Sequence, residues 1–529
     1  MAGRASKRNH RSWLPALCPA QPSSMVESLV PVGCLASPSN FRRSIRSTLA
    51  AFEHALKVGK SHMHSIQPPV AKRVMPWSKS VLLYVGLAAS FLILSGLGGR
   101  METLIDLDSK SYLEAPTSSL KLMLEDFRTP GYPLFLDLME SLGSLEWVPW
   151  IHGAIWLAAV GCLLATMSLW GIDRYALLAV AIALGNHPFL HFWSRVIISD
   201  TLAMSMALMS TAAMMEALRR RQSNWTGGWF WAVAGLTFAA IWIRPAFLFL
   251  LVLWPLVIAW WRWANDREPF RRAMGDAGKL AVLCWSPLLL YSLMRWMVVG
   301  HFGLVSFGGY NVIGIAGQFL EQKDLQHLPA EIQATAEEIL VQRDRHPSFL
   351  RNDDDRFSLM LDRYNPMIWE VTFPIYEKKQ LSRLTSNQQL TTLSRSLIRR
   401  HWRDYLWWLT LNARHGIRGT AMQVGANPGI RLLLMLGIVL IAWRSLPTSL
   451  SDRFPPGETS ARLVYHPSAT GLRLLFWISL GMLLGNVLLV ILVEPAIERY
   501  MAVSTVLPSA WLAISIQRFL LDIVPTAKP

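Results

Sequence analysis

Ten apolar segments of roughly 17 to 22 residues each limit what this chain can fold into more than any other feature. They lie near 81–99, 148–170, 175–193, 201–217, 228–243, 246–261, 279–299, 429–446, 472–493 and 502–522. Segments of this length and composition are typical of helices that cross a bilayer. Only 16% of the residues are charged, where a soluble protein has about a quarter. We therefore predict an all-α polytopic membrane protein with about ten transmembrane helices.

Much of the positive charge lies before the first apolar segment. The formal net charge is +16, and residues 1–80 contain twelve Lys and Arg against two acids. Basic residues next to membrane helices favour the cytoplasm. The sequence therefore predicts that 1–78 is a basic, disordered cytoplasmic tail, and no nucleic-acid partner is expected. An alternative start at Met75 would remove this tail.

The loops continue the same charge pattern. Arginines cluster after the fourth, sixth and eighth apolar segments, at Arg219, Arg220 and Arg221, at Arg262, Arg267, Arg271 and Arg272, and at Arg444, Arg453, Arg462 and Arg473. The loop 100–147 instead holds nine acids against four basic residues. The pattern predicts that this first loop faces outward and that the arginine-rich loops are cytoplasmic.

Three further regions follow from this topology. Residues 79–299 form a transmembrane core of seven spans that includes the first outer loop 100–147. Residues 300–428 have a soluble composition, which predicts a small α-rich outer-face domain. Its aromatic, arginine-flanked run at 405–410 is typical of an interfacial helix. Residues 429–529 hold the last transmembrane helices. The segment 429–446, interrupted by Arg431, is the weakest of the ten predicted spans. If it does not cross the membrane, the predicted orientation of every later segment is inverted.

Polar residues in the first outer loop form two short motifs. Asp106-Leu-Asp108 is followed four residues later by Tyr112, and Arg128-Thr-Pro-Gly-Tyr132-Pro leads into the next apolar segment. This arrangement resembles the polytopic glycosyltransferases of the protein mannosyltransferase-like, family 39 type, which use lipid-phosphate sugars. In that family a first-loop Asp and a Tyr four residues later precede an Arg-x-Pro-Gly-Tyr-Pro element.

Three later motifs are similar to the same family. Ser199-Asp200 opens the fourth apolar segment, where the family usually has Ser-Glu or Thr-Glu. Arg244-Pro245 separates the fifth and sixth segments, and Glu498-Arg499-Tyr500 precedes the last one, with its proline late, at Pro508. The resemblance covers roughly residues 80–265 and 490–515. No motif of the family is evident in 300–428.

The loop charges provide a test that does not use these motifs. Under the topology above, Asp108, Arg128, Asp200, Arg244 and Arg499 all fall at the outer face. One active site requires its parts on one side of the membrane. The coincidence therefore supports a single site, although the acids can also be read as solvated loop residues and Arg128 as a headgroup anchor.

The resemblance implies transfer of a sugar from a polyprenyl-phosphate donor to an acceptor hydroxyl. Asp108, with Asp106 second, is the expected catalytic base. Arginine forks match phosphate oxygens, and displacement with one carboxylate would invert the anomeric centre. The expected substrate-binding residues are Tyr112, Arg128, Tyr132, Asp200, Arg244, Glu498, Arg499 and Tyr500.

Several alternatives stay open. Asp106 and Asp108 form an Asp-x-Asp pair that can hold Mg²⁺ or Mn²⁺, although no metal site is assigned. A secondary transporter or lipid-carrier flippase would need midplane polar residues and a repeat, neither of which is clear here. An O-antigen polymerase or ligase would use the same donors. The expected location is a bacterial inner membrane with the site facing the periplasm, and the acceptor is a lipid, a glycan or a protein.

Overall fold

The structure is a computed structural model that describes residues 101–221, 227–351, 355–445 and 469–523. All of them belong to one compact unit that extends from Trp77 to Pro529. The predicted tail 1–78 and the first predicted span, 81–99, lie outside the described residues.

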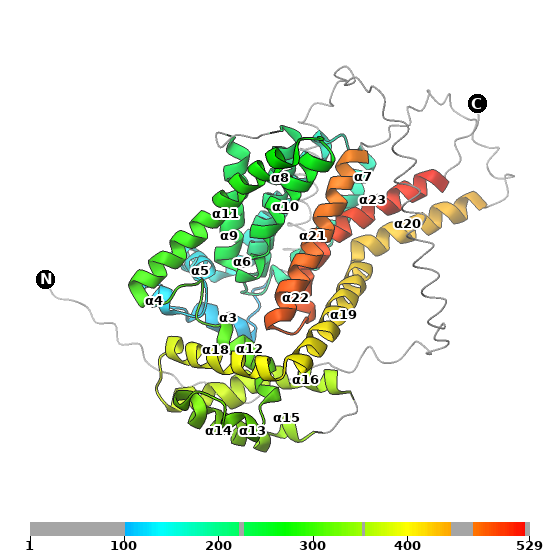
Figure 1. Cartoon of the computed structure of the whole chain (residues 1–529). Coiled ribbons are helices and arrows are strands. Elements are labelled where there is room, and N and C mark those ends of the chain that lie inside the picture. The colour runs from blue at the N-terminus through cyan, green and yellow to red at the C-terminus, as the bar shows by residue number, and fades with distance from the viewer. Residues whose placement is uncertain (1–100, 222–226, 352–354, 446–468, 524–529) are drawn as a thin grey trace, which may run out of the picture. The chain divides into compact units, whose positions relative to one another are not determined.

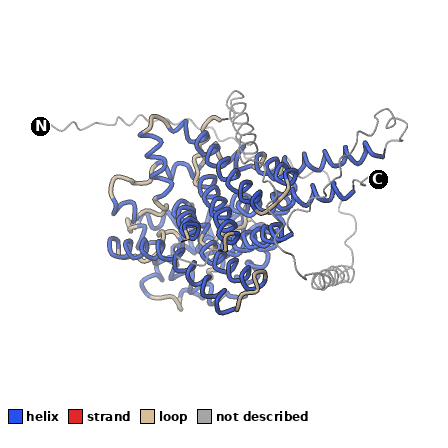
Figure 2. Tube along the Cα trace, turned by 90° about the horizontal axis from the view of Figure 1, so that it is seen from above, coloured by secondary structure: helices blue, strands red, loops and turns tan. Residues whose placement is uncertain are grey.

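Helices make up every named element of the described part (Figure 1). The α-helices before residue 300 are α3 (Leu107–Leu113), α4 (Leu120–Glu125), α5 (Gly131–Ser141), α6 (Val148–Leu169), α7 (Arg174–Gly185), α8 (Asp200–Arg219), α9 (Gly228–Ile243), α10 (Leu250–Ala264) and α11 (Phe270–Val299). Figure 2 shows helices and loops but no strand in the same residues. The one β-type contact that the structure describes is a parallel bridge between Leu104 and Val196.

Shorter helices fill the middle of the chain, and long ones return near its end. They are α12 (Gly308–Ala316), α13 (Gln322–Leu325), α14 (Ala330–Arg345), α15 (Pro347–Leu350), α16 (Arg356–Pro366), α17 (Phe373–Lys378), α18 (Arg383–Arg400), α19 (Trp402–Ala426), α20 (Pro428–Ser445), α21 (Ala469–Val493), α22 (Glu498–Ala502) and α23 (Val506–Ile523). Single turns of 3-10 helix occur at Leu145–Trp147, Pro245–Phe247, Gly317–Phe319 and Val503–Thr505, and π-helical turns at Phe189–Trp193 and Met367–Thr372.

Six described helices are long and apolar enough to cross a membrane. They are Leu145–Leu169, Asp200–Arg219, Pro245–Ala264, Phe270–Val299, Thr470–Val493 and Glu498–Leu520. A seventh span arises if Trp402–Ala426 and Pro428–Val439, bent by 56° at Asn427, are counted as one. The chain is therefore an all-α, multi-pass membrane protein, as predicted.

The predicted count of about ten is not confirmed. Two apolar segments form helices too short to span alone: α7 ends at Gly185, and α9 has 16 residues. A proline, which lacks the N–H for the next helical hydrogen bond, lies just beyond each of these helix ends. Pro188 follows α7, and Pro245 follows α9. The predicted span 429–446 is α20, which becomes long enough only together with α19.

Helix α8 lies at the centre of the membrane part. Of its apolar window, 89% is buried, against 33% for α11. Small and hydroxyl side chains let neighbouring helices approach closely and bond across the contact. Ser210 of α8 is 2.9 Å from the Thr237 hydroxyl of α9, and Trp254 of α10 donates to that hydroxyl at 3.0 Å. Three helices are thus joined at one point inside the bundle.

The region 300–428 has an apolar core of its own, built around Tyr310, Ile339, Met367, Leu393 and Trp408. Helices α12 to α18 group around it (Figure 1). The run at 405–410, predicted to lie on the bilayer surface, is part of the 25-residue helix α19, which packs on α21 and α22. The described residues of this region are therefore mostly helical, as predicted.

Candidate functional site

Five predicted site residues meet in one charged network. Asp108 is the second residue of α3, and Arg128 precedes α5. Asp200 is the first residue of α8, Arg244 directly follows α9, and Arg499 is the second residue of α22. Because α8 begins where α9 ends, these positions share one end of the bundle. The loops joining distant helices bring together residues as much as 391 positions apart.

The charges alternate along the network, which we call the Asp–Arg network. Arg128 donates to Oδ1 of Asp108 at 3.0 Å, and Arg499 donates to Oδ2 of the same carboxylate. Arg499 also reaches Oδ2 of Asp200 at 3.1 Å, and Arg244 reaches that oxygen at 2.5 Å. Each carboxylate is therefore shared by two guanidinium groups, and Arg499 connects the two carboxylates.

Tyrosines line the same network. The Tyr112 hydroxyl lies 2.8 Å from the Ser199 hydroxyl and accepts from Arg128 at 3.3 Å. The Arg128 guanidinium also lies 4.4 Å from the centre of the Tyr112 ring, and Tyr132 packs edge-on against that ring at 4.9 Å. The Arg244 guanidinium lies 5.6 Å from the Tyr500 ring centre. All three predicted tyrosines thus contact the network or each other.

Positive charge exceeds negative charge here by one, since three arginines face two aspartates. Burial disfavours ionisation of Asp108, but Arg499 and Arg128 outweigh that effect and lower its pKa. Three buried polar atoms of the site, Asp200 Oδ1, Arg244 Nε and the Tyr132 hydroxyl, have no hydrogen-bond partner among the described residues. Buried polar groups are normally paired, so a site with excess positive charge and unused polar atoms suits an anionic, polar ligand.

Glu494 is a site residue that the sequence did not reveal. It follows α21, and its Oε1 accepts from Asn311 Nδ2 at 2.5 Å. Burial raises its pKa, although Arg244 opposes the shift. This carboxyl is therefore harder to ionise than a glutamate in water. No motif marks this residue, because its neighbours in space come from 300–428, where no family pattern was found.

The same region fixes the position of Arg499. The last carbonyls of a helix have no partner within it. At the end of α21 three side chains of 300–428 donate to them: Tyr405 to Leu492 at 2.7 Å, Tyr364 to Val493 at 3.3 Å and Asn412 to Glu494 at 2.9 Å. Helix α22, which carries Arg499, begins directly after this capped turn. Helices of 300–428 therefore hold the turn from which Arg499 reaches both aspartates.

The glycine of the Arg128-Thr-Pro-Gly-Tyr132-Pro motif, Gly131, is required by a close backbone contact. A Cβ atom there would lie 2.7 Å from the backbone oxygen of Trp242. Beside it, the Thr129 hydroxyl donates to the carbonyl of Ile243 at 3.1 Å. The start of α5 thus touches the end of α9 directly, and this contact sets the spacing of Arg128 and Arg244.

Gly131→Ala should therefore destabilise the fold by about 1–3 kcal/mol, since the backbone that it meets cannot rotate away as a side chain can. Thermal unfolding of the purified protein in detergent would show a lower Tm than wild type. Gly185→Ala is the matched control, because no heavy atom lies within 4 Å of its added Cβ. Equal losses in both variants, or none in Gly131→Ala, would contradict the close contact.

Two predicted residues lie outside the network. Asp106 is exposed, and its backbone N–H donates to Ser109 at 2.8 Å. Glu498 is also exposed, and its backbone carbonyl accepts from Gln423 at 2.9 Å. Within the described ranges no group of three or more His, Cys, Asp or Glu side chains is arranged to hold a metal ion. Both carboxylate oxygens of Asp108, which a cation would need as ligands, are paired with the guanidinium groups of Arg128 and Arg499.

No protein-family model matches the chain, and no curated protein does. A function is therefore inferred from the site itself and from the motifs that predicted it.

Proposed function

We propose that the chain is an integral membrane glycosyltransferase that moves a sugar from a polyprenyl-phosphate donor to an acceptor hydroxyl. The observation that carries this proposal is the Asp–Arg network at one end of a membrane bundle. It combines the carboxylates of Asp108 and Asp200 with three arginines from separate segments of the chain. A donor of this kind keeps its lipid in the bilayer and presents its phosphate and sugar at the water boundary, and the proposal assigns the site to that boundary.

The arginines suit the phosphate. Guanidinium forks bind phosphate oxygens with two parallel hydrogen bonds, and Arg244, Arg499 and Arg128 converge from three directions. In the free protein their partners are Asp108 and Asp200. A bound phosphate competes for the same donors, which frees the Asp108 carboxylate from part of its pairing and makes it a stronger base.

Transfer then needs one displacement. The acceptor oxygen attacks the anomeric carbon, its proton passes to the Asp108 carboxylate, and the bond from that carbon to the phosphate oxygen breaks. The polyprenyl phosphate leaves with the bonding electron pair, and the arginines hold the negative charge that develops on it. A single displacement inverts the anomeric centre, unlike the two-carboxylate double displacement of retaining enzymes.

A direct assay uses the purified full-length chain in proteoliposomes. The probes are polyprenyl-phosphate sugars extracted from membranes of the source cells, with an envelope extract as the acceptor. Release of free polyprenyl phosphate that requires both the protein and the extract is the expected result. Release without the acceptor extract, or none under any condition in which the protein is folded, would contradict the proposal.

The proposal places the site at the periplasmic face of a bacterial inner membrane, and reporter fusions test this orientation. Fusions after Arg221 and after Arg272 should report the cytoplasm, because arginine-rich loops are retained there. Fusions within 300–420 should report the opposite side. A cytoplasmic signal from 300–420 would reverse the orientation and, with it, the face at which transfer is expected.

A further inference from the structure

Glu494 is a carboxyl beside the Asp–Arg network that takes no part in the ion pairs of the network. Electrostatic interactions link it to Asp108 and to all three arginines. Each of these arginines pairs with an aspartate instead, and none of the ion pairs among the described residues includes Glu494. The carboxyl and the guanidinium groups are therefore separated by more than an ion-pair distance, which a ligand with one anionic end and one polar end can bridge.

Helices of 300–428 fix the position of Glu494 at both its backbone and its side chain. Asn412 of α19 is fully buried; it donates to the carbonyl of Glu494 at 2.9 Å and accepts from the backbone N–H of Ala496 at 2.8 Å. Asn311 of α12 donates to Oε1 of the carboxyl at 2.5 Å. A side chain held in this way keeps one orientation, as a ligand-binding residue requires.

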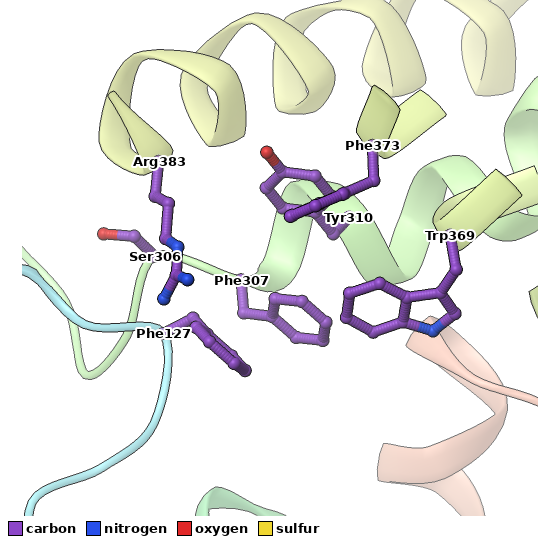
Figure 3. A pocket seen from close by; sticks show the side chains of 7 residues that line it. All are labelled: Phe127, Ser306, Phe307, Tyr310, Trp369, Phe373 and Arg383. Carbon is purple, nitrogen blue, oxygen red and sulfur yellow. The ribbon is translucent and has the colours of Figure 1, made fainter. Parts of the chain in front are cut away.

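A cluster of aromatic rings fixes the start of α12, which carries Asn311, to the first loop. The Phe307 ring centre lies 5.3 Å from that of Phe127 and 5.8 Å from that of Trp369. Figure 3 shows Phe307 between these two rings. Phe127 directly precedes Arg128 in the chain. Packed side chains therefore set the spacing between Asn311 and the arginines of the network.

Glu494 and Asn311 each retain one acceptor oxygen. Oε1 of Glu494 accepts from Asn311, whereas the described residues provide no hydrogen bond to Oε2. A carboxylate only accepts, so Asn311 turns its amide N–H toward Glu494 and keeps its own Oδ1 as a second acceptor. Both side chains are half-buried, so a ligand can reach these oxygens. Such a ligand must donate hydrogen bonds to them.

The charges determine which end of a polyprenyl-phosphate sugar lies on which side. Guanidinium groups attract the phosphate and provide its donors, whereas a carboxylate provides none. Sugar hydroxyls donate readily to carboxylate and amide oxygens. The sugar is bonded directly to the phosphate, so its hydroxyls lie within one ring of the phosphate oxygens. A donor whose phosphate contacts the arginines therefore suits this site with its sugar toward Glu494.

We propose that Glu494 and Asn311 bind hydroxyl groups of the donor's sugar and so select the sugar-linked carrier over free polyprenyl phosphate. This inference rests on the proposed glycosyl transfer and assigns the residues that recognise its donor. Free polyprenyl phosphate is the product of transfer and has no hydroxyl groups for these residues. The same contacts therefore favour exchange of the product for a new donor.

Two lipids that differ only in the sugar test this selection. Sugar-linked carrier is extracted from membranes of the source cells, and mild acid hydrolysis of the same extract yields free polyprenyl phosphate. Binding of each to the full chain in detergent is measured by mass spectrometry of the retained lipid. Glu494→Ala should weaken binding of the sugar-linked carrier by about tenfold, since a hydrogen bond to its sugar is lost. Free polyprenyl phosphate should bind at least as tightly as to wild type, because its phosphate does not depend on Glu494.

Three further variants complete the experiment. Glu494→Gln keeps one acceptor oxygen, so its affinity for the sugar-linked carrier should lie between those of wild type and Glu494→Ala. If Glu494→Ala does not fold, Glu494→Gln allows the same comparison. Asn311→Ala should show the same selective loss. The matched control is Glu337→Ala, an exposed glutamate of α14, which should bind both lipids like wild type.

The outcomes separate this inference from the proposed function. If Glu494→Ala weakens binding of both lipids equally, Glu494 only supports the turn that carries Arg499, and the inference is wrong. The inference is also wrong if the variants bind the sugar-linked carrier like wild type, or if wild type does not prefer that carrier, even where turnover is observed. If the preference depends on Glu494 but no donor is consumed, recognition of the carrier stands and the transferase proposal fails.

Discussion

Asp108→Asn should lower donor turnover by about 10²–10⁴-fold, the usual contribution of a general base. The substitution keeps the shape of the side chain and an oxygen that accepts from Arg128 or Arg499, but it removes the proton acceptor. Donor binding should change little, since the three arginines stay in place and lose a competing partner. Turnover in proteoliposomes and donor retention on the same preparation measure the two effects separately.

Asp106→Asn is the matched control for this variant. The two aspartates are two residues apart, yet Asp106 is exposed and Asp108 is paired with two arginines. Asp106→Asn should therefore turn over at close to the wild-type rate. If the pair holds a divalent metal instead, both variants should fail and EDTA should reproduce the loss. Wild-type turnover in a properly inserted Asp108→Asn protein would remove Asp108 from the mechanism.

Arg244→Ala should weaken donor binding and also lower turnover. Together the two effects should lower kcat/KM for the donor by more than tenfold. A charge that binds phosphate acts in the ground state, and it acts more strongly as the leaving phosphate gains charge. The fold should survive, because Asp200 keeps its contact with Arg499 at 3.1 Å. The measurement is the dependence of turnover on donor concentration, which separates kcat from KM.

Arg244→Lys refines this test. It retains the positive charge but not the planar fork that can hold two phosphate oxygens. We expect donor affinity between those of wild type and Arg244→Ala. If Arg244→Ala binds the donor as tightly as wild type does, Arg244 is a structural partner of Asp200 and not a phosphate ligand.

Much of the fold follows from local patterns in the sequence. Apolar runs at 148–170, 201–217 and 472–493 correspond to helices because a bilayer-length apolar segment has few other ways to satisfy its backbone. Apolar length does not distinguish a spanning helix from one stopped by proline, which explains the short α7 and α9. Proline alone does not supply the missing signal, because Pro255 and Pro287 lie inside the spanning helices α10 and α11.

The site was predictable where residue types and order carry the signal. The order of Asp108, Arg128, Asp200, Arg244 and Arg499 along the chain, with their loop positions, was enough to place them at one face. Their pairing depends on how helices pack, so the bridge from Arg499 to both aspartates has no sequence signature. Glu494 was missed for the same reason, since its hydrogen-bond partners Asn311 and Asn412 come from 300–428.

The central claim is that Asp108 drives transfer of a lipid-linked sugar, and the carrier pool of living cells tests it most directly. Cells whose own copy of the gene is deleted would express either wild-type protein or Asp108→Asn at equal levels in the membrane. Mass spectrometry of the extracted lipids measures polyprenyl phosphate with and without its sugar. We predict that the sugar-linked carrier accumulates with Asp108→Asn and returns to its normal level with wild type. Identical carrier pools in the two strains would contradict the account.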